Sequence, residues 1–265
     1  MNKIEVKVIA EHGDAGKMMS FLARLTQRGA DIKSMEDLEA LMEKPASTKL
    51  VENMVALDNH HTIRRFTPIT VAIVGASRRF LAQIRTHSVG LNFVSASLQY
   101  SDYSGKGRFV VPYSILEADC TVGNNALCNY YLDTCSAAMS AYEHIAENTD
   151  NDTAGYAAPQ GLRNILIIQG NHDAWLNMIK LRSCNRNTTE TQYVVMRIWE
   201  ELLKTEDGES MFKFAGPDCL YGVCKEDKFC CGDPMRRYIK QAKENDISIP
   251  RAIIDDKWPL LKELT

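Results

Sequence analysis

The chain has 265 residues, of which 45% are hydrophobic and 25% are charged, so an ordinary globular core is possible. Its formal net charge of −3 argues against a general nucleic-acid binder, and no apolar run approaches the length of a membrane span. The first residues alternate polar and apolar without the apolar core of a signal peptide, so we expect a cytoplasmic protein.

The first quarter of the chain predicts one strand followed by helices. Ile4–Ala10 alternates like a strand, and Ala15–Arg28 follows it as a helix. Ser34 is placed to cap a second helix, with Asp37 at the position where a capping box prefers Glu or Gln. A further helix is expected over Thr48–Leu57.

The middle of the chain predicts a buried strand, a helix, a loop and a long helix. Ile69–Gly75 is rich in β-branched residues, and Ser77 after it is a plausible helix N-cap. The polar residues beyond that helix predict a loop. Cys120–Ala146 has helical spacing with few breakers, and Glu147–Thr153 predicts a surface turn.

The second half begins with another strand and helix. Ile165–Ile168 is a buried-strand candidate that ends at Gly170, and a helix is expected to follow. From Thr191 onward, apolar residues fall on one face of a helix: Val195, Ile198, Trp199, Leu202 and Leu203. The remaining residues contain several prolines and predict loops. Without a repeat or a linker, the pattern favours one mixed α/β domain over residues 1–265.

Eight cysteines raise the question of a metal site or disulfides. Four of them are clustered, at Cys219, Cys224, Cys230 and Cys231. A cytosolic chain seldom carries a disulfide framework. The spacing is not a repeated CxxC pair, so free or buried thiols are favoured over zinc.

Two segments carry the residue types of a binding site. In Ser77–Tyr103, the cations Arg78, Arg79 and Arg85 precede a loop of hydroxyl and amide side chains. Such donors suit an anionic, planar ligand. In Gly170–Gln192, Asn and Arg side chains offer mixed donors and acceptors for the edge of a ring. Taken alone, the second segment would equally fit a solvated helix with caps.

Together the segments resemble the flavin-dependent thymidylate synthases, whose signature is RHR-x-x-S-x-N-x-x-S-x-R-Y after an S-R-x-x-x-x-Q run. Ser77-Arg78 and Gln83 match the front end, and Thr86-His87-Ser88 occupies the place of Arg-His-Arg. The back end is recognisable, with one extra residue, in Asn92, Ser95, Ser97, Gln99, Tyr100 and Ser101.

Further segments extend the resemblance over residues 60–231. Asn171, Leu181 and Arg182 match the family's N-x-R-x-x-x-x-F-x-x-L-R segment, and Gln192 follows after about four inserted residues. Ala154–Pro159 resembles its A-R-x-V-L-P element, and the cysteine-rich tail resembles that of some members.

The resemblance implies a mixed α/β domain around a curved sheet with flanking helices, assembled as a homotetramer with active sites at subunit junctions. It implies reductive methylation of dUMP to dTMP, with FAD as cofactor, methylenetetrahydrofolate as carbon donor and NADPH as reductant. The protein would then supply orientation, desolvation and polarisation. Neither a nucleic acid nor a membrane is expected as a partner.

The resemblance also assigns roles to residues. Arg182 is the expected catalytic residue, donating to the uracil and stabilising negative charge on it. Gln83, Ser97, Leu98 (through its backbone N–H) and Gln99 are expected to contact the nucleotide. The expected cofactor-binding residues are His61, Arg85, Thr86, His87, Ser88, Asn92, Asn171 and Asn177.

The departures from the family pattern all remove positive charge. Thr86, Ser88, Gln99, Gly155 and Asp173 each stand where members have arginine. Since charge-assisted hydrogen bonds are the stronger ones, this predicts weaker binding of a nucleotide phosphate.

Other cations in the sequence could compensate, and Arg85 and Arg163 are the first candidates because they lie near the altered positions. Two alternatives stay open: a homologue acting on another uracil nucleotide or nucleoside, and a non-catalytic flavin- or nucleotide-binding homologue.

Overall fold

The computed structural model describes residues 3–56 and 60–264. Four strands form one sheet in the order β1-β2-β4-β3, and every neighbouring pair is antiparallel. The strands are β1 Glu5–Glu11, β2 Pro68–Ser77, β3 Leu91–Ser95 and β4 Arg163–Asn171. The class is therefore the mixed α/β fold that the sequence predicts.

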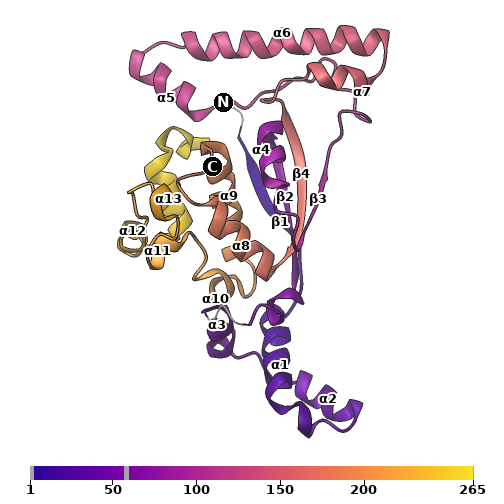
Figure 1. Cartoon of the computed structure of the whole chain (residues 1–265), viewed down its shortest axis with the longest axis vertical. Coiled ribbons are helices and arrows are strands. Elements are labelled where there is room, and N and C mark those ends of the chain that lie inside the picture. Colours follow the sequence, from indigo (N-terminus) through magenta and orange to yellow (C-terminus); the bar gives the residue numbers. More distant parts are fainter. Residues whose placement is uncertain (1–2, 57–59, 265) are drawn as a thin grey trace.

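One face of this sheet packs into the core. In β2 and β4 the buried residues alternate with more exposed ones, and the pairs Ile73↔Leu166 and Val71↔Ile168 lie opposite each other on the inner face. Four helices contribute buried side chains to the same core: α4 Arg78–Ile84, α8 His172–Arg182, α9 Thr189–Leu203 and α13 Ile249–Lys257. In Figure 1 helices α8, α9 and α13 lie on the left of the sheet.

The opposite face of the sheet carries exposed apolar side chains. Val74 pairs with Ile165, and Val94 pairs with Ile167, so all four point to the same side. Val74, Ile165 and Val94 are 42%, 48% and 70% exposed. Among the described helices, none lies against this face in Figure 1. We call these four residues the open-face patch.

The other helices form groups at the two ends of the sheet, as Figure 1 shows. Near one end are α1 Ala15–Arg28, α2 Met35–Met42, α3 Thr48–Ala56 and α10 Gly208–Phe212. At the other end are α5 Tyr113–Val122, α6 Ala126–Asn148 and α7 Asn151–Ala154. Towards the C-terminus, α11 Asp218–Tyr221 and α12 Arg237–Asn245 lie beside α13.

The predicted caps are confirmed. Ser34 and Asp37 form a reciprocal capping box at the start of α2. The Ser77 hydroxyl accepts a hydrogen bond from the Phe80 N–H at the start of α4. The helix predicted over Thr48–Leu57 is α3, and Leu57 lies outside the described residues.

Several predicted boundaries are wrong. The expected polar loop contains β3, a short strand whose polar side chains alternate with Leu91, Phe93 and Val94 too briefly to be recognised. The predicted Cys120–Ala146 helix is two helices, since the chain turns at Gly123 with φ 76°.

Two further corrections concern predicted loops. Part of the expected surface turn at Glu147–Thr153 is helical, because Asp150 caps α7 through the Thr153 N–H. The expected loop-rich C-terminal part holds α10 to α13, and the prolines there lie at helix starts or between helices; Pro250, for example, occupies the first turn of α13. In the described chain, no helix is long and apolar enough to cross a membrane.

Candidate functional site

The site begins where strands lead into helices. The chain continues from β2 into α4 and from β4 into α8. Ser77 caps the first of these helices, and Asn171 caps the second. Since β2 and β4 are antiparallel, the helices start at opposite ends of the sheet. Their C-terminal ends therefore meet, bringing the two predicted segments together.

Arg182, at the end of α8, is held by the residues that follow α4. Its Nε–H donates to His87 Nε2 at 2.5 Å, and Nη2 donates to the Thr86 hydroxyl at 2.8 Å. Nη1 donates to Asn187 Oδ1 at 3.0 Å. These bonds fix the plane of the guanidinium and leave further N–H donors for a ligand.

His87 accepts a hydrogen bond as neutral imidazole. Its half-buried position lowers its pKa, and the charge of Arg182 lowers the pKa further. Neutral His87 keeps Nε2 free to accept from Arg182, so the two effects preserve the contact.

Gln83 lies on α4 within the same cluster. Its Oε1 accepts from the Thr188 hydroxyl at 2.7 Å and from the Thr191 hydroxyl at 2.6 Å. These bonds occupy the carbonyl end of the amide and leave the Gln83 NH₂ as a donor. We call Gln83, Thr86, His87 and Arg182 the guanidinium cluster.

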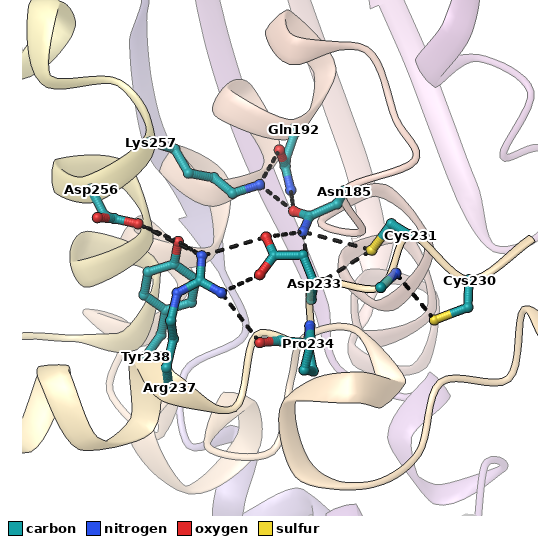
Figure 2. Close-up of polar contacts among 11 residues, drawn as sticks. Asn185, Gln192, Cys230, Cys231, Asp233, Pro234, Arg237, Tyr238, Asp256 and Lys257 are labelled. Atoms are coloured by element: carbon teal, nitrogen blue, oxygen red, sulfur yellow. Dashed lines mark hydrogen bonds and ion pairs between the residues drawn. The ribbon is translucent and has the colours of Figure 1, made fainter.

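A polar network from the C-terminal region holds the 183–188 loop that carries Asn187 and Thr188. Lys257 Nζ donates to Asn185 Oδ1 and, at 3.2 Å, to Gln192 Oε1. Asn185 Nδ2 donates to Asp233 Oδ2 at 3.1 Å. Figure 2 shows these contacts continuing from Asp233 to Arg237. The partners of Arg182 and Gln83 are therefore anchored by helices α12 and α13.

A second group gathers where α8 begins. His61 Nδ1 lies 2.5 Å from Asp173 Oδ1, and Arg64 and Arg65 pair with the same carboxylate at 3.1 Å and 3.3 Å. One carboxylate, the Asp173 side chain, therefore gathers two arginines and a histidine at this corner. Of the three, His61 and Arg65 are at least half exposed, whereas Arg64 is buried.

The other expected cofactor contacts surround this corner or lie on the sheet. Asn171 Oδ1 accepts from the Ala174 N–H as the N-cap of α8, and Asn177 is exposed on the same helix. Ser88 is exposed just beyond His87. Asn92 is exposed on β3 opposite Gln169, so it lies on the open face of the sheet.

The nucleotide-binding loop expected at Ser97 to Gln99 lies elsewhere. The Ala96 N–H donates to the Ile165 oxygen, so the chain that leaves β3 runs beside the beginning of β4. There Leu98 packs against Ala154 and helix α6. A Cβ on Gly155 would lie 3.3 Å from Leu98 Cβ, so this loop and the altered arginine position are neighbours.

The side chains of this loop make few contacts. The Ser97 hydroxyl accepts from the Gln99 N–H at 3.1 Å, and Gln99 is exposed. The described structure thus brings the predicted site together in two halves, the guanidinium cluster and the Ser97–Gln99 loop, at different levels of the sheet.

The two cations expected to compensate for the missing arginines have other contacts. Arg85 Nη2 donates to the Ser95 hydroxyl at 2.5 Å, next to the guanidinium cluster. Arg163 donates to the backbone oxygens of Gly75 and Lys3, which places its charge at the sheet end. Of the two, only Arg85 lies beside the predicted site.

The cysteines do not assemble a metal site within the described chain. All eight are free thiols, and no group of three or more His, Cys, Asp or Glu side chains there is placed to hold a metal ion.

Several residues of the site were not predicted. Asn187, Thr188 and Thr191 lie between the matched residues Arg182 and Gln192, and they bond to Arg182 or Gln83. In the sequence, the run of hydroxyl and amide residues in NRNTTETQ was the signal that pointed to them. Arg64 and Arg65, next to His61, were likewise visible only as a basic pair.

Comparison with solved structures finds the same fold. Thymidylate Synthase X from Helicobacter pylori, solved with FAD and dUMP, matches with a TM-score of 0.56 and 17% identity over 79% of this chain and 97% of that chain. A UMP/dUMP methylase, PolB from Streptomyces cacaoi, matches with a TM-score of 0.65 and 13% identity over 81% of this chain and 97% of that chain.

Sequence comparison identifies the family. A flavin-dependent thymidylate synthase from Geobacter sulfurreducens is 22% identical over 232 residues, 86% of this chain and 94% of the relative. One from Pyrococcus furiosus is 25% identical over 63% of this chain and 68% of the relative. The model of the family "Thymidylate synthase complementing protein" matches residues 7–205. Since that match covers most of the chain, the chain belongs to the flavin-dependent thymidylate synthase family of enzymes.

Proposed function

We propose that this protein is a flavin-dependent thymidylate synthase that methylates dUMP to dTMP, with methylenetetrahydrofolate as carbon donor and NADPH as reductant. The observation that supports it best is the guanidinium cluster, in which three side chains fix Arg182. Such a fixed cation is suited to stabilise negative charge on a pyrimidine carbonyl oxygen as its ring becomes nucleophilic.

The residues at the start of α8 fit the cofactor of the family. FAD carries anionic phosphates and a ring edged with donors and acceptors, and when bound it supplies the electrons of the reduction. Arg65, which is 57% exposed, offers a cation there beside its ion pair with Asp173. His61, Asn171 and Asn177 offer hydrogen bonds, and His87 lies on the side of the guanidinium cluster.

A homotetramer with active sites at subunit junctions belongs to the same proposal. The two halves of the site occupy different levels of one sheet, so a second copy is needed to bring a Ser97–Gln99 loop to a guanidinium cluster. The open-face patch supplies an apolar surface for association. We further propose a cytoplasmic protein and a single domain over residues 1–265.

The test is growth of a thymidine-requiring strain. The wild-type chain is expected to restore growth without thymidine, and Arg182→Ala is expected to fail because the fixed cation is lost. Arg186→Ala, which removes a nearby exposed arginine, is expected to behave like the wild type. A purified protein that cannot be loaded with FAD, or growth with Arg182→Ala, would contradict the proposal.

A related substrate is the second candidate, and the uncharged Ser97–Gln99 loop favours it. Gln99 and Gly155 place no cation beside this loop, which is the expected phosphate side. The chemistry would remain while UMP or an uncharged deoxyuridine replaced dUMP. Comparing kcat/KM for dUMP, UMP and deoxyuridine separates the two, since a phosphate-dependent enzyme loses activity on deoxyuridine.

A further inference from the structure

A cavity of about 510 Å³ lies beside the guanidinium cluster. It is enclosed by the start of α4, the start of α9, helices α5 and α6, and residues 259–264. Its volume is in the range of about 300–1,000 Å³ typical of small-molecule pockets. Gln83, His87 and Arg182 are not among its walls, and Thr188 is the residue that it shares with the site described above.

The cavity includes parts of the chain that the family match does not reach. Lys3, Ile4 and Leu261 line it, and all three lie outside residues 7–205. Residues near both ends of the described chain therefore line the same cavity beside α9.

The walls are mainly aromatic and aliphatic. Tyr113, Tyr131 and Tyr193 contribute rings, and the Tyr131 hydroxyl donates to the Val110 oxygen at 2.8 Å. A Cβ on Gly161 would lie 1.9 Å from that hydroxyl, so the glycine at this position leaves room for the Tyr131 side chain. Such walls suit a flat apolar or aromatic body.

The charged groups of the cavity favour an anion. Glu190 is internally satisfied, since its carboxylate accepts from the Ser77 N–H at 2.7 Å and from the Ser77 hydroxyl at 2.5 Å. Lys3 and Arg79 also line the cavity, and within the described residues neither forms an ion pair. Lys3 and Arg79 are both exposed, and the charge of Arg79 acts to lower the pKa of Glu190, so the two cations outnumber the one carboxylate of the cavity.

We propose that this cavity is a second ligand site, which takes an aromatic molecule bearing one anionic group. The aromatic body lies against the tyrosines, and the carboxylate, sulfonate or phosphate meets Lys3 and Arg79. The site adjoins the guanidinium cluster, because Thr188 lines the cavity and also donates to Gln83.

Two dyes that differ only in charge test this assignment. 1-Anilinonaphthalene-8-sulfonate has the aromatic body and an anion, and N-phenyl-1-naphthylamine has the same body without the sulfonate. Both are titrated by fluorescence into the purified full chain with FAD and dUMP in excess. We expect one saturable sulfonate-dye site per chain, with a Kd at least about tenfold lower than that of the neutral dye.

Variants locate the site. Lys3→Gln/Arg79→Gln should abolish the preference for the sulfonate, while Ser114→Trp, which fills the cavity from an exposed wall position, should abolish both dyes. The matched control Arg28→Gln/Lys33→Gln removes the same two charges at exposed positions near α1 and α2 and should bind like the wild type.

Three results would overturn the assignment. They are equal affinity for the two dyes, an unchanged preference in Lys3→Gln/Arg79→Gln, and unaltered binding in Ser114→Trp. Dye binding that occurs only when the assembled protein dissociates would also overturn it, since a second copy would then occupy the cavity.

Discussion

At the scale of single residues, the site depends on a neutral histidine beside a fixed arginine. His87 accepts from Arg182 only while its Nε2 is unprotonated. Burial and the neighbouring guanidinium both favour that state by lowering the His87 pKa. His87 at the signature position therefore keeps a contact with Arg182 even though Thr86 and Ser88 stand in place of the flanking arginines.

The stability of the protein is expected to depend on pH through His87. Because the folded-state pKa of His87 lies below its ordinary value of 6.5, the unfolded chain binds the proton more readily. The contribution of His87 to stability is therefore present above pH 6.5 and is lost as the pH falls through the folded-state pKa. Wild type should lose more free energy of unfolding between pH 7 and about pH 5 than His87→Gln does.

Arg182→Ala gives the matching measurement by NMR. Removing the guanidinium should raise the His87 pKa, whereas His144→Gln, at an exposed position, should leave the His87 titration unchanged. A His87 titration that is the same with and without Arg182 would refute the electrostatic coupling.

At the scale of elements, the bulge in β2 positions the start of α4. The β2–β4 register shifts between Val74 and Ala76, and Gly75 between them has φ 92°. A Cβ there would lie 1.8 Å from Arg163 Nη2, so the arginine side chain occupies the space that only glycine leaves. The bulge thus sets where β2 ends and Ser77 begins its helix.

Gly75→Ala should therefore destabilise the protein by about 2–4 kcal/mol, combining the cost of positive φ with displacement of Arg163. Gly105→Ala is the matched control, because Gly105 also has positive φ but nothing within 4 Å of a new Cβ. It should cost only about 1 kcal/mol. Urea unfolding measures both, and equal losses would show that Arg163 is not displaced.

The C-terminal helices reach the site through Lys257. Burial lowers the Lys257 pKa, and its ammonium donates to Asn185 and Gln192, whose segment carries Asn187 and Thr188. The segment that contacts Arg182 and Gln83 is therefore itself held by α13.

Lys257→Met should cost about 1–2 kcal/mol of unfolding free energy, because two acceptors lose a donor. It should also raise the KM for the nucleotide, while Lys257→Arg restores part of both. Lys240→Met, which removes an 80% exposed lysine side chain on α12, serves as the control. An unchanged KM in a destabilised Lys257→Met would limit this network to a structural role.

At the scale of the whole molecule, no helix of the described residues covers one face of the sheet. The open-face patch is apolar at its centre, and on β1 the same face carries Glu5 and Lys7 opposite Val74 and Ala72. An apolar centre with a polar edge is the usual anatomy of an interface between protein subunits.

Val94→Asp is expected to separate the proposed tetramer, because it buries a charge at the centre of that interface. The fold should persist, since Val94 is 70% exposed in the single chain. Light scattering after gel filtration measures the mass, and Val223→Asp, at an 82% exposed position just after α11, is the control. An unaltered mass for Val94→Asp would place the interface elsewhere.

The sequence by itself determined the class of the fold, the caps at Ser34 and Ser77, and the two segments that meet at Arg182. These features depend on local chemistry: β-branched runs, capping side chains and motif spacing within one segment. It did not predict β3, the break at Gly123 or the helices near the C-terminus, where short or mixed patterns are decided by packing.

Only the tertiary structure decided which side chains serve the site. Asp173 replaces an arginine, yet Arg64 and Arg65 from a distant turn surround it. Thr188 became a partner of Gln83, and His87 a partner of Arg182, because α4 and α8 approach from opposite ends of an antiparallel sheet. Such contacts join residues some hundred positions apart, and their geometry exists only once the chain has packed.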